Sequence, residues 1–165
     1  MVSPDIIKKA AHKLKPGKSD PLFSFSSDFI KHGLEKLYSL LSSLYQGFMT
    51  HAYVTQGLLI STLVPIVKDQ LSSISISKNY CSVCLSSLTV KLMYWIIIIL
   101  SKDTLQLNEL QFAYQEDCST TMCTLALLET IDFLRNGNNL FTIATDMSKA
   151  FDTTLHSKMF EKLVF

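Results

Sequence analysis

The segment Leu140-Phe-Thr-Ile-Ala-Thr-Asp146-Met-Ser-Lys149-Ala-Phe151-Asp152 carries more information about fold and function than any other part of the chain. It begins with apolar and β-branched residues, which favour a strand over residues 140–146. Such a strand places the carboxylate of Asp146 at its C-terminal end, where the oxygens stay open to a hard cation such as Mg²⁺. An Asp that caps the following turn has the same sequence context, so both interpretations remain at this point.

Composition predicts a folded chain rather than a disordered one. With 165 residues, 48% of them hydrophobic, the chain is long enough to bury a core as one domain. Its net charge of +1 gives no general basic field for nucleic acid. Residues 1–18 nevertheless hold five Lys against Asp5 alone. This basic stretch is either a phosphate-facing segment or the solvated face of a helix.

Hydrophobic periodicity and helix punctuation predict an α+β fold that is mostly helical, with few strands and no linker that divides it into two domains. Ser119 is placed to cap one helix, and Asp152 to cap the last one rather than to share a metal with Asp146. Pro65 should restrict its strand to the edge of a sheet. We expect helices over residues 2–15, 26–48, 83–100, 119–134 and after 152, and strands over residues 57–67 and 140–146.

Neither a secretory signal nor a membrane span is evident in the sequence. The longest uncharged apolar run, residues 92–100, is flanked by lysines and is expected to form a buried helix. Four Cys without an export signal predict reduced thiols in an intracellular setting, nuclear or cytoplasmic. Cys81 and Cys84 have zinc-knuckle spacing, and Cys118 and Cys123 complete a candidate set of four thiolates, against which free buried Cys is the commoner outcome.

Five segments, in order along the chain, resemble the reverse transcriptase of non-LTR (LINE-type) retrotransposons. The two most specific are residues 110–120, LQFAYQEDCST, similar to "QFGFRxGxST", and residues 145–156, TDMSKAFDTTLH, similar to "LDLSKAFDxVxH". Residues 63–68, LVPIVK, resemble "VPIPK", and residues 78–85, KNYCSVCL, resemble "NYRPISL". Residues 13–20, KLKPGKSD, resemble the lysine-rich stretch that opens the fingers region of the family, and the resemblance covers roughly residues 8–163.

The resemblance implies one partial reverse transcriptase domain, with a fingers-like region over about residues 1–138 and the start of a polymerase palm over residues 139–165. It implies an RNA-directed DNA polymerase, a nucleotidyltransferase that uses an RNA template, a DNA primer and dNTPs. Two Mg²⁺ ions clamp the attacking 3′-hydroxyl and the triphosphate in this chemistry. No membrane partner is implied.

The same resemblance assigns roles to individual residues. Asp146 matches the first metal-binding aspartate of the palm and is the expected catalytic residue, with the carbonyl of Met147 beside it. Phe151 matches the aromatic residue that excludes a ribose 2′-hydroxyl, although it is equally suited to core packing. Lys68 matches a lysine that contacts the incoming triphosphate, and Lys149 is either a second phosphate contact or a solvated side chain.

The chain also departs from the family pattern. Cys81 and Gln115 stand where the family has Arg, and Arg135 is the only Arg present, so phosphate-binding charge is lost. The family completes its metal site with an aromatic-x-Asp-Asp hairpin that follows a Gln-Gly helix, and this chain contains no Asp-Asp pair. One palm carboxylate cannot hold two Mg²⁺ ions, so we expect a truncated, catalytically incomplete chain.

Two alternatives share these motifs. The first is a non-enzymatic protein that retains the fingers fold as an RNA- or partner-binding surface, supported by the basic residues 8–18. The second is a chain that folds poorly alone, because the strand at residues 140–146 and the last helix would normally pack against further palm structure.

Overall fold

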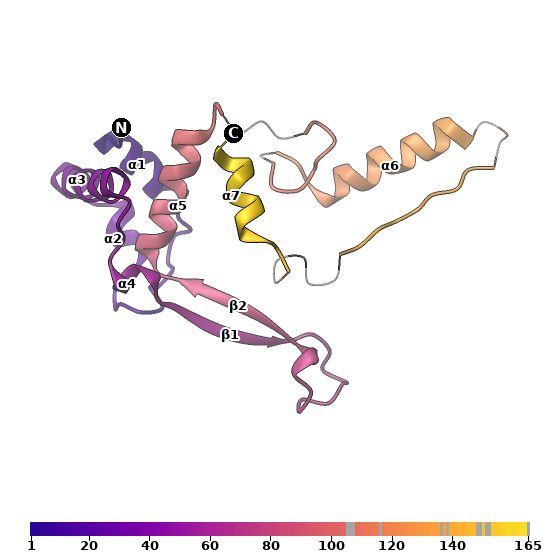
Figure 1. Cartoon of the computed structure of the whole chain (residues 1–165), viewed down its shortest axis with the longest axis horizontal. Helices are drawn as coiled ribbons and strands as arrows, with labels where there is room; N and C mark the ends of the chain where they lie inside the picture. Colours follow the sequence, from indigo (N-terminus) through magenta and orange to yellow (C-terminus); the bar gives the residue numbers. More distant parts are fainter. Residues whose placement is uncertain are drawn as a thin grey trace. The chain divides into compact units, whose positions relative to one another are not determined.

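The computed structural model describes residues 1–104, 108–115, 117–135, 137, 139–147, 150 and 153–164, apart from the side chains of Lys78 and Val164. The chain forms two compact units, Met1–Gln106 and Leu107–Phe165. Helices and a two-stranded antiparallel sheet are both present, which confirms the mixed helix-and-sheet class (Figure 1). The boundary near residue 138 inferred from the resemblance remains a prediction.

The first unit begins with helix α1, Pro4–Lys13, where a helix was predicted. Ser3 caps it by accepting a hydrogen bond from the N–H of Ile6, and Pro4 occupies a first-turn position that needs no N–H donor. The helix ends before Pro16 and Gly17, and Gly17 has a φ of +64°, a conformation that side chains disfavour.

The long helix predicted from residue 26 to residue 48 is two helices, so this prediction was wrong in its continuity. Helix α2 spans Ser27–Lys31 and α3 spans Glu35–His51, with Gly33 between them. Gly disfavours helix interiors, and the hydroxyl of Tyr38 donates to the carbonyl oxygen of Lys31 at 2.9 Å, which satisfies the end of α2. The break therefore has both a sequence cause and a tertiary one.

The buried face of α3 does not coincide with the regularly spaced leucines at positions 34, 37, 41 and 44, which favour a helix here. Tyr38, Ser42 and Tyr45 are its buried residues, whereas Leu34 is 79% exposed. The polar atoms of this face have partners: the Ser42 hydroxyl donates to the carbonyl of Val2, and the Tyr45 hydroxyl donates to the carbonyl of Thr89. An apolar periodicity cannot reveal such a face, because its burial depends on partners from distant segments.

A β-hairpin follows the short helix α4, Gln56–Leu59. Strand β1, Ser61–Val67, pairs antiparallel with β2, Tyr80–Ser86, and Val67 lies opposite Tyr80. Pro65 lies in a strand with one neighbour in the described sheet, as predicted. The prediction of a helix from residue 83 was wrong, because residues 80–86 pair with β1 and helix α5, Leu88–Ser101, begins only after Ser87 caps it.

The core of the first unit lies among α1, α3 and α5, and the hairpin extends away from these helices (Figure 1). Of the apolar run 92–100, Leu92 and Ile96 are fully buried, while Ile97 is 44% exposed. No described helix is long and apolar enough to cross a membrane. The buried hydrophobic residues of the core are Val2, Ile7, Ala10, Ala11, Leu14, Ile30, Tyr38, Tyr45, Leu88, Leu92 and Ile96.

The second unit has helices α6, Thr120–Arg135, and α7, His156–Val164. Ser119 caps α6 as predicted, with its hydroxyl accepting from the N–H of Met122 at 3.2 Å. The strand predicted over residues 140–146 is absent: these residues have no regular strand pairing, and Phe141 and Ile143 are 90% and 87% exposed. A strand needs a neighbour for its backbone, and the described part of this unit contains none.

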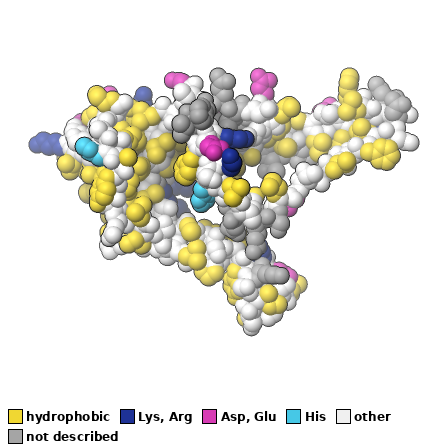
Figure 2. All heavy atoms as spheres, viewed as in Figure 1, with side chains coloured by type: hydrophobic (Ala, Val, Ile, Leu, Met, Phe, Trp, Pro, Cys, Tyr) yellow, Lys and Arg dark blue, Asp and Glu magenta, His cyan; other side chains and the backbone are white. Residues whose placement is uncertain are grey.

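No described residue of the second unit is buried. The helix predicted over residues 119–134 is present as α6, and its regularly spaced apolar residues Met122, Leu125, Leu128 and Leu134 are each about half exposed. Figure 2 shows hydrophobic side chains on the surface of this helix. The predicted cap of the last helix, Asp152, lies outside the described residues.

Candidate functional site

Lys68, the predicted triphosphate contact, directly follows the last residue of β1 and has an exposed side chain. Its backbone N–H donates to the carbonyl oxygen of Asn79 at 2.8 Å, which extends the pairing of the hairpin by one residue. Ile66 lies opposite Cys81 in the antiparallel register. Because side chains alternate along a strand, Cys81 is on the same face of the hairpin as Ile66 and near the strand end that leads to Lys68.

Hydrogen bonds from polar groups in and next to it stabilise the loop between the two strands, residues 68–79. The Asn79 side chain accepts from the N–H of Asp69 at 3.0 Å and donates to the carbonyl of Asp69 at 2.9 Å. The Tyr80 hydroxyl donates to the carbonyl of Ile74 at 2.8 Å. Hydrogen bonds from the Ser72 hydroxyl and then from the Leu71 N–H hold the pKa of the Asp69 carboxyl below its ordinary value.

Asp146, the predicted metal ligand, is exposed and lies in the extended segment of the second unit rather than at the end of a strand. Met147 next to it is 75% exposed. Lys149 and Phe151 lie outside the described residues. Among the described residues, no group of three or more His, Cys, Asp or Glu side chains is arranged to hold a metal ion. The described donors therefore do not assemble a Mg²⁺ site around Asp146.

The four cysteines do not match the expected environments. Cys84 falls within the helix predicted over residues 83–100 and was expected to be buried, yet it lies in β2 with its side chain exposed, as does Cys81. Three residues apart on a strand, these two thiols point to opposite faces of the hairpin, so they cannot share one metal ion as a knuckle would. Cys118 is half-buried and Cys123 is exposed.

The basic N-terminal segment lies on α1 and the loop after it. Lys8 forms an ion pair with Glu35 at 3.1 Å, and the Lys13 ammonium lies 5.9 Å from the centre of the Trp95 ring. The Glu35 carboxylate, through its hydrogen bond and its charge, raises the pKa of Lys8. Three further lysines of this segment have exposed side chains: Lys9, Lys15 and Lys18.

Charge is divided unequally between the two units. Residues 1–106 hold 11 Lys and 6 Asp or Glu, a net charge of +5, and residues 107–165 hold 4 Lys or Arg and 8 Asp or Glu, a net charge of −4. The total of +1 conceals this division. The basic segment predicted from the sequence is therefore part of a unit that is cationic as a whole.

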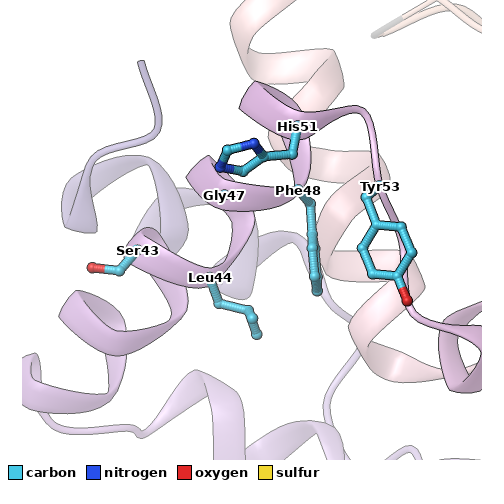
Figure 3. Close-up of a pocket in the computed structure, with 6 residues that line it drawn as sticks. All are labelled: Ser43, Leu44, Gly47, Phe48, His51 and Tyr53. Atoms are coloured by element: carbon cyan, nitrogen blue, oxygen red, sulfur yellow. The ribbon is translucent and has the colours of Figure 1, made fainter.

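A pocket of about 360 Å³ lies on the outer side of α3, lined by apolar side chains and by His51 (Figure 3). Two of its lining residues, Leu44 and Tyr53, are 47% and 63% exposed, so the pocket is a shallow depression. None of the predicted site residues lines it. Its full lining is Ser43, Leu44, Gly47, Phe48, His51 and Tyr53.

The structural roles of two polar residues were not predicted from the sequence. Asn79 organises the hairpin loop, and Asp20 joins the loop after α1 to helix α5. Asp followed by Pro, and Asn at the start of a strand after a polar loop, are turn-forming signals that point to such roles without naming the partners. Comparison with protein-family models, with curated proteins and with solved structures yields no match to this chain.

Proposed function

We propose that this chain is the N-terminal part of the reverse transcriptase domain of a non-LTR retrotransposon. On this proposal the first unit derives from the polymerase fingers and the segment around Asp146 from the first palm motif. Support comes from five motif-like segments that occur in the family's order over roughly residues 8–163. The ancestral activity is RNA-directed DNA synthesis from dNTPs, with Mg²⁺ as the cofactor.

The pairing of β1 with β2 is the observation that supports the proposal most. Residues 63–68 and 78–85 resemble two separate family motifs, and they come together as the two strands of one hairpin. Lys68 and Cys81, which stand where the family has its phosphate-binding Lys and Arg, lie near the same end of that hairpin. In the family, a Lys and an Arg at these two positions suit the phosphates of an incoming nucleotide, and this chain keeps the Lys.

We expect the chain by itself to be catalytically inactive. Asp146 is the one palm carboxylate that the resemblance supplies, and the sequence has no Asp-Asp pair to complete a two-metal site. The roles of Lys149 as a phosphate contact and Phe151 as the sugar-selecting aromatic rest on the resemblance. We expect no primer extension by this chain on an RNA template, and an extension signal abolished by Asp146→Asn would overturn that expectation.

Equilibrium binding of dTTP to the purified chain, with and without Mg²⁺, tests the proposal. We expect Lys68→Ala to weaken dTTP binding roughly tenfold, as loss of a charge-assisted contact does. Lys36→Ala removes an exposed lysine from α3 and serves as the matched control. Equal affinities for the Lys68 and Lys36 variants would contradict the proposal.

A second candidate function is RNA binding without catalysis, favoured by the net charge of +5 on residues 1–106. It predicts binding to single-stranded RNA that weakens steeply with salt, because counterions released into a more concentrated salt solution gain less entropy. A variant with Lys9, Lys15 and Lys18 all changed to Ala should lose this binding, whereas Asp146→Asn should keep it. RNA binding that is independent of these lysines would exclude this candidate.

A further inference from the structure

Among the described side chains of the hairpin loop, that of Asn79 is the most strongly buried polar one. It is 9% exposed, whereas Leu71 and Ile74 of the same loop are 98% and 70% exposed. Its side chain makes two hydrogen bonds to the backbone of Asp69, one to the N–H and one to the carbonyl. Its main-chain carbonyl accepts from the N–H of Lys68. One residue thus holds two consecutive residues at the end of β1.

The chemistry of this clamp requires a carboxamide. Asn offers one acceptor and one donor side by side, which match the acceptor and donor of a single peptide residue. An Asp at position 79 keeps the acceptor but places a second oxygen against the carbonyl of Asp69, and an aliphatic residue loses both bonds. The Asn79 amide also lies 3.5 Å from the carbonyls of Ser72 and Ser73, which closes the first half of the loop over it.

The Asn79 side chain fixes Asp69, so Lys68 is held between strand β1 on one side and the clamped Asp69 on the other. Strand pairing ends at Val67 and Tyr80, and beyond that point the Lys68 N–H donates to the main-chain carbonyl of Asn79. The side-chain bonds of Asn79 to Asp69 keep this end of the hairpin closed. A lysine side chain loses much rotamer freedom when it binds an anion, and a fixed backbone reduces the remaining cost of binding. We propose that Asn79 is a positioning residue that fixes Lys68 for contact with the phosphates of a nucleoside triphosphate.

This inference rests on the proposed nucleotide role of Lys68 and adds a residue that acts through it. The loop supplies a matched control, because the Tyr80 hydroxyl ties the same loop at Ile74 without touching Lys68 or Asp69. Tyr80→Phe therefore releases the loop at a different point, while Asn79→Leu removes the clamp and preserves side-chain size. A general loosening of the loop affects both variants, and positioning of Lys68 is specific to Asn79.

Two readouts on the full chain test the inference: hydrogen exchange of the Lys68 and Asp69 amides by NMR, and equilibrium binding of dTTP with Mg²⁺. Asn79→Leu removes the side-chain bonds to Asp69 and keeps the main-chain bond to the Lys68 N–H. We expect it to speed exchange of the Asp69 amide at least tenfold, to speed exchange of the Lys68 amide because the end of the hairpin opens more often, and to weaken dTTP binding roughly tenfold. Tyr80→Phe should change neither quantity. In a Lys68→Ala background, Asn79→Leu should weaken dTTP binding no further, because Asn79 affects binding only by positioning Lys68.

Failures of the two proposals are distinguishable. If Lys68→Ala weakens dTTP binding and Asn79→Leu does not, the positioning role is wrong and the proposed function stands. If Lys68→Ala has no effect on dTTP binding, the nucleotide role of Lys68 is wrong, and amide exchange alone decides whether Asn79 holds Lys68. Unchanged exchange of the Lys68 amide in Asn79→Leu overturns the positioning inference in either case.

Discussion

The carboxylate of Asp20 accepts a hydrogen bond from the backbone N–H of Leu88, 68 residues later in the chain. Its other oxygen accepts from the N–H groups of Leu22 and Phe23, each at 2.8 Å. Asp20 is 8% exposed, and Leu88 is the first residue of α5, where the helix dipole favours a negative charge. One side chain thus joins the loop after α1 to the N-terminus of the helix that crosses the core.

Removal of the Asp20 carboxylate should therefore destabilise the first unit strongly. We expect Asp20→Ala to lower the free energy of unfolding by about 3 kcal/mol, because three backbone N–H groups lose a charged acceptor. Trp95, the only Trp in the chain, lies on α5 and reports unfolding of this unit in urea. Asp103→Ala, at an exposed position, is the control, and equal stability of the two variants would refute this role of Asp20.

Tyr45 should make the first unit sensitive to alkaline pH. Burial raises the pKa of the Tyr45 phenol above its ordinary value of about 10. The stability that the neutral phenol contributes is complete below about pH 10 and is lost as the pH rises from there towards the folded-state pKa. Tyr45→Phe should cost about 1 kcal/mol at neutral pH, because the bond to Thr89 is lost, and should weaken the alkaline dependence.

The exposed Tyr53 provides the comparison for this pH effect. Tyr53→Phe removes a phenol that is already solvated, so the slope of unfolding free energy against pH should stay as in the unmodified chain. Urea titrations between pH 8 and pH 11 measure that slope. Identical slopes for Tyr45→Phe and Tyr53→Phe would show that the Tyr45 phenol is not the source of the alkaline sensitivity.

Two glycines of the helical region should respond to alanine with opposite signs. A Cβ at Gly33, between α2 and α3, would lie 2.5 Å from Cδ2 of Leu37 and 3.2 Å from the carbonyl oxygen of Ile30. Leu37 can turn aside at a modest cost, so we expect Gly33→Ala to destabilise by about 1 kcal/mol. A Cβ at Gly47 inside α3 meets nothing within 4 Å, and Gly47→Ala should stabilise by about 1 kcal/mol. Urea denaturation measures both changes in the free energy of unfolding. Stabilisation by Gly33→Ala would show that the space beside Gly33 accepts a methyl group without cost.

If the proposed nucleotide role of Lys68 is correct, an Arg at position 81 should strengthen phosphate binding. We expect Cys81→Arg to tighten dTTP binding by about three- to tenfold, since Arg binds phosphate through two parallel N–H groups and Cys81 lies near Lys68 on the hairpin. Ser82→Arg adds the same charge to the opposite face, where Ser82 pairs with Pro65, and should leave the affinity nearly unchanged. Equal gains from the two arginines would indicate a non-specific charge effect.

Local signals in the sequence were sufficient for the helices with caps and for the turn residues. Ser119 caps α6 and Gly17 ends the first helical region, and both roles depend on neighbours a few residues away. Strand β2 was missed because its apolar residues continue directly into α5, and only pairing with β1 separates the two elements. The predicted strand at residues 140–146 had the right composition, but the described part of its unit offers no partner strand.

In the candidate site, too, local features could be predicted from the sequence and tertiary contacts could not. Lys68 lies at the end of a strand, as its motif predicted, whereas its support from Asn79 is a tertiary contact that no spacing rule announces. The position of Asp146 depended on a strand that did not form in the described residues, so its environment could not be inferred from the strand pattern.

The proposal that this chain derives from a non-LTR reverse transcriptase is tested most directly by reading the transcript and the genomic sequence downstream of the Phe165 codon. The account predicts a Gln-Gly segment followed by an aromatic-x-Asp-Asp motif, either in frame or as a decayed remnant with frameshifts and stops. Downstream sequence that resembles no polymerase palm in any reading frame would contradict it.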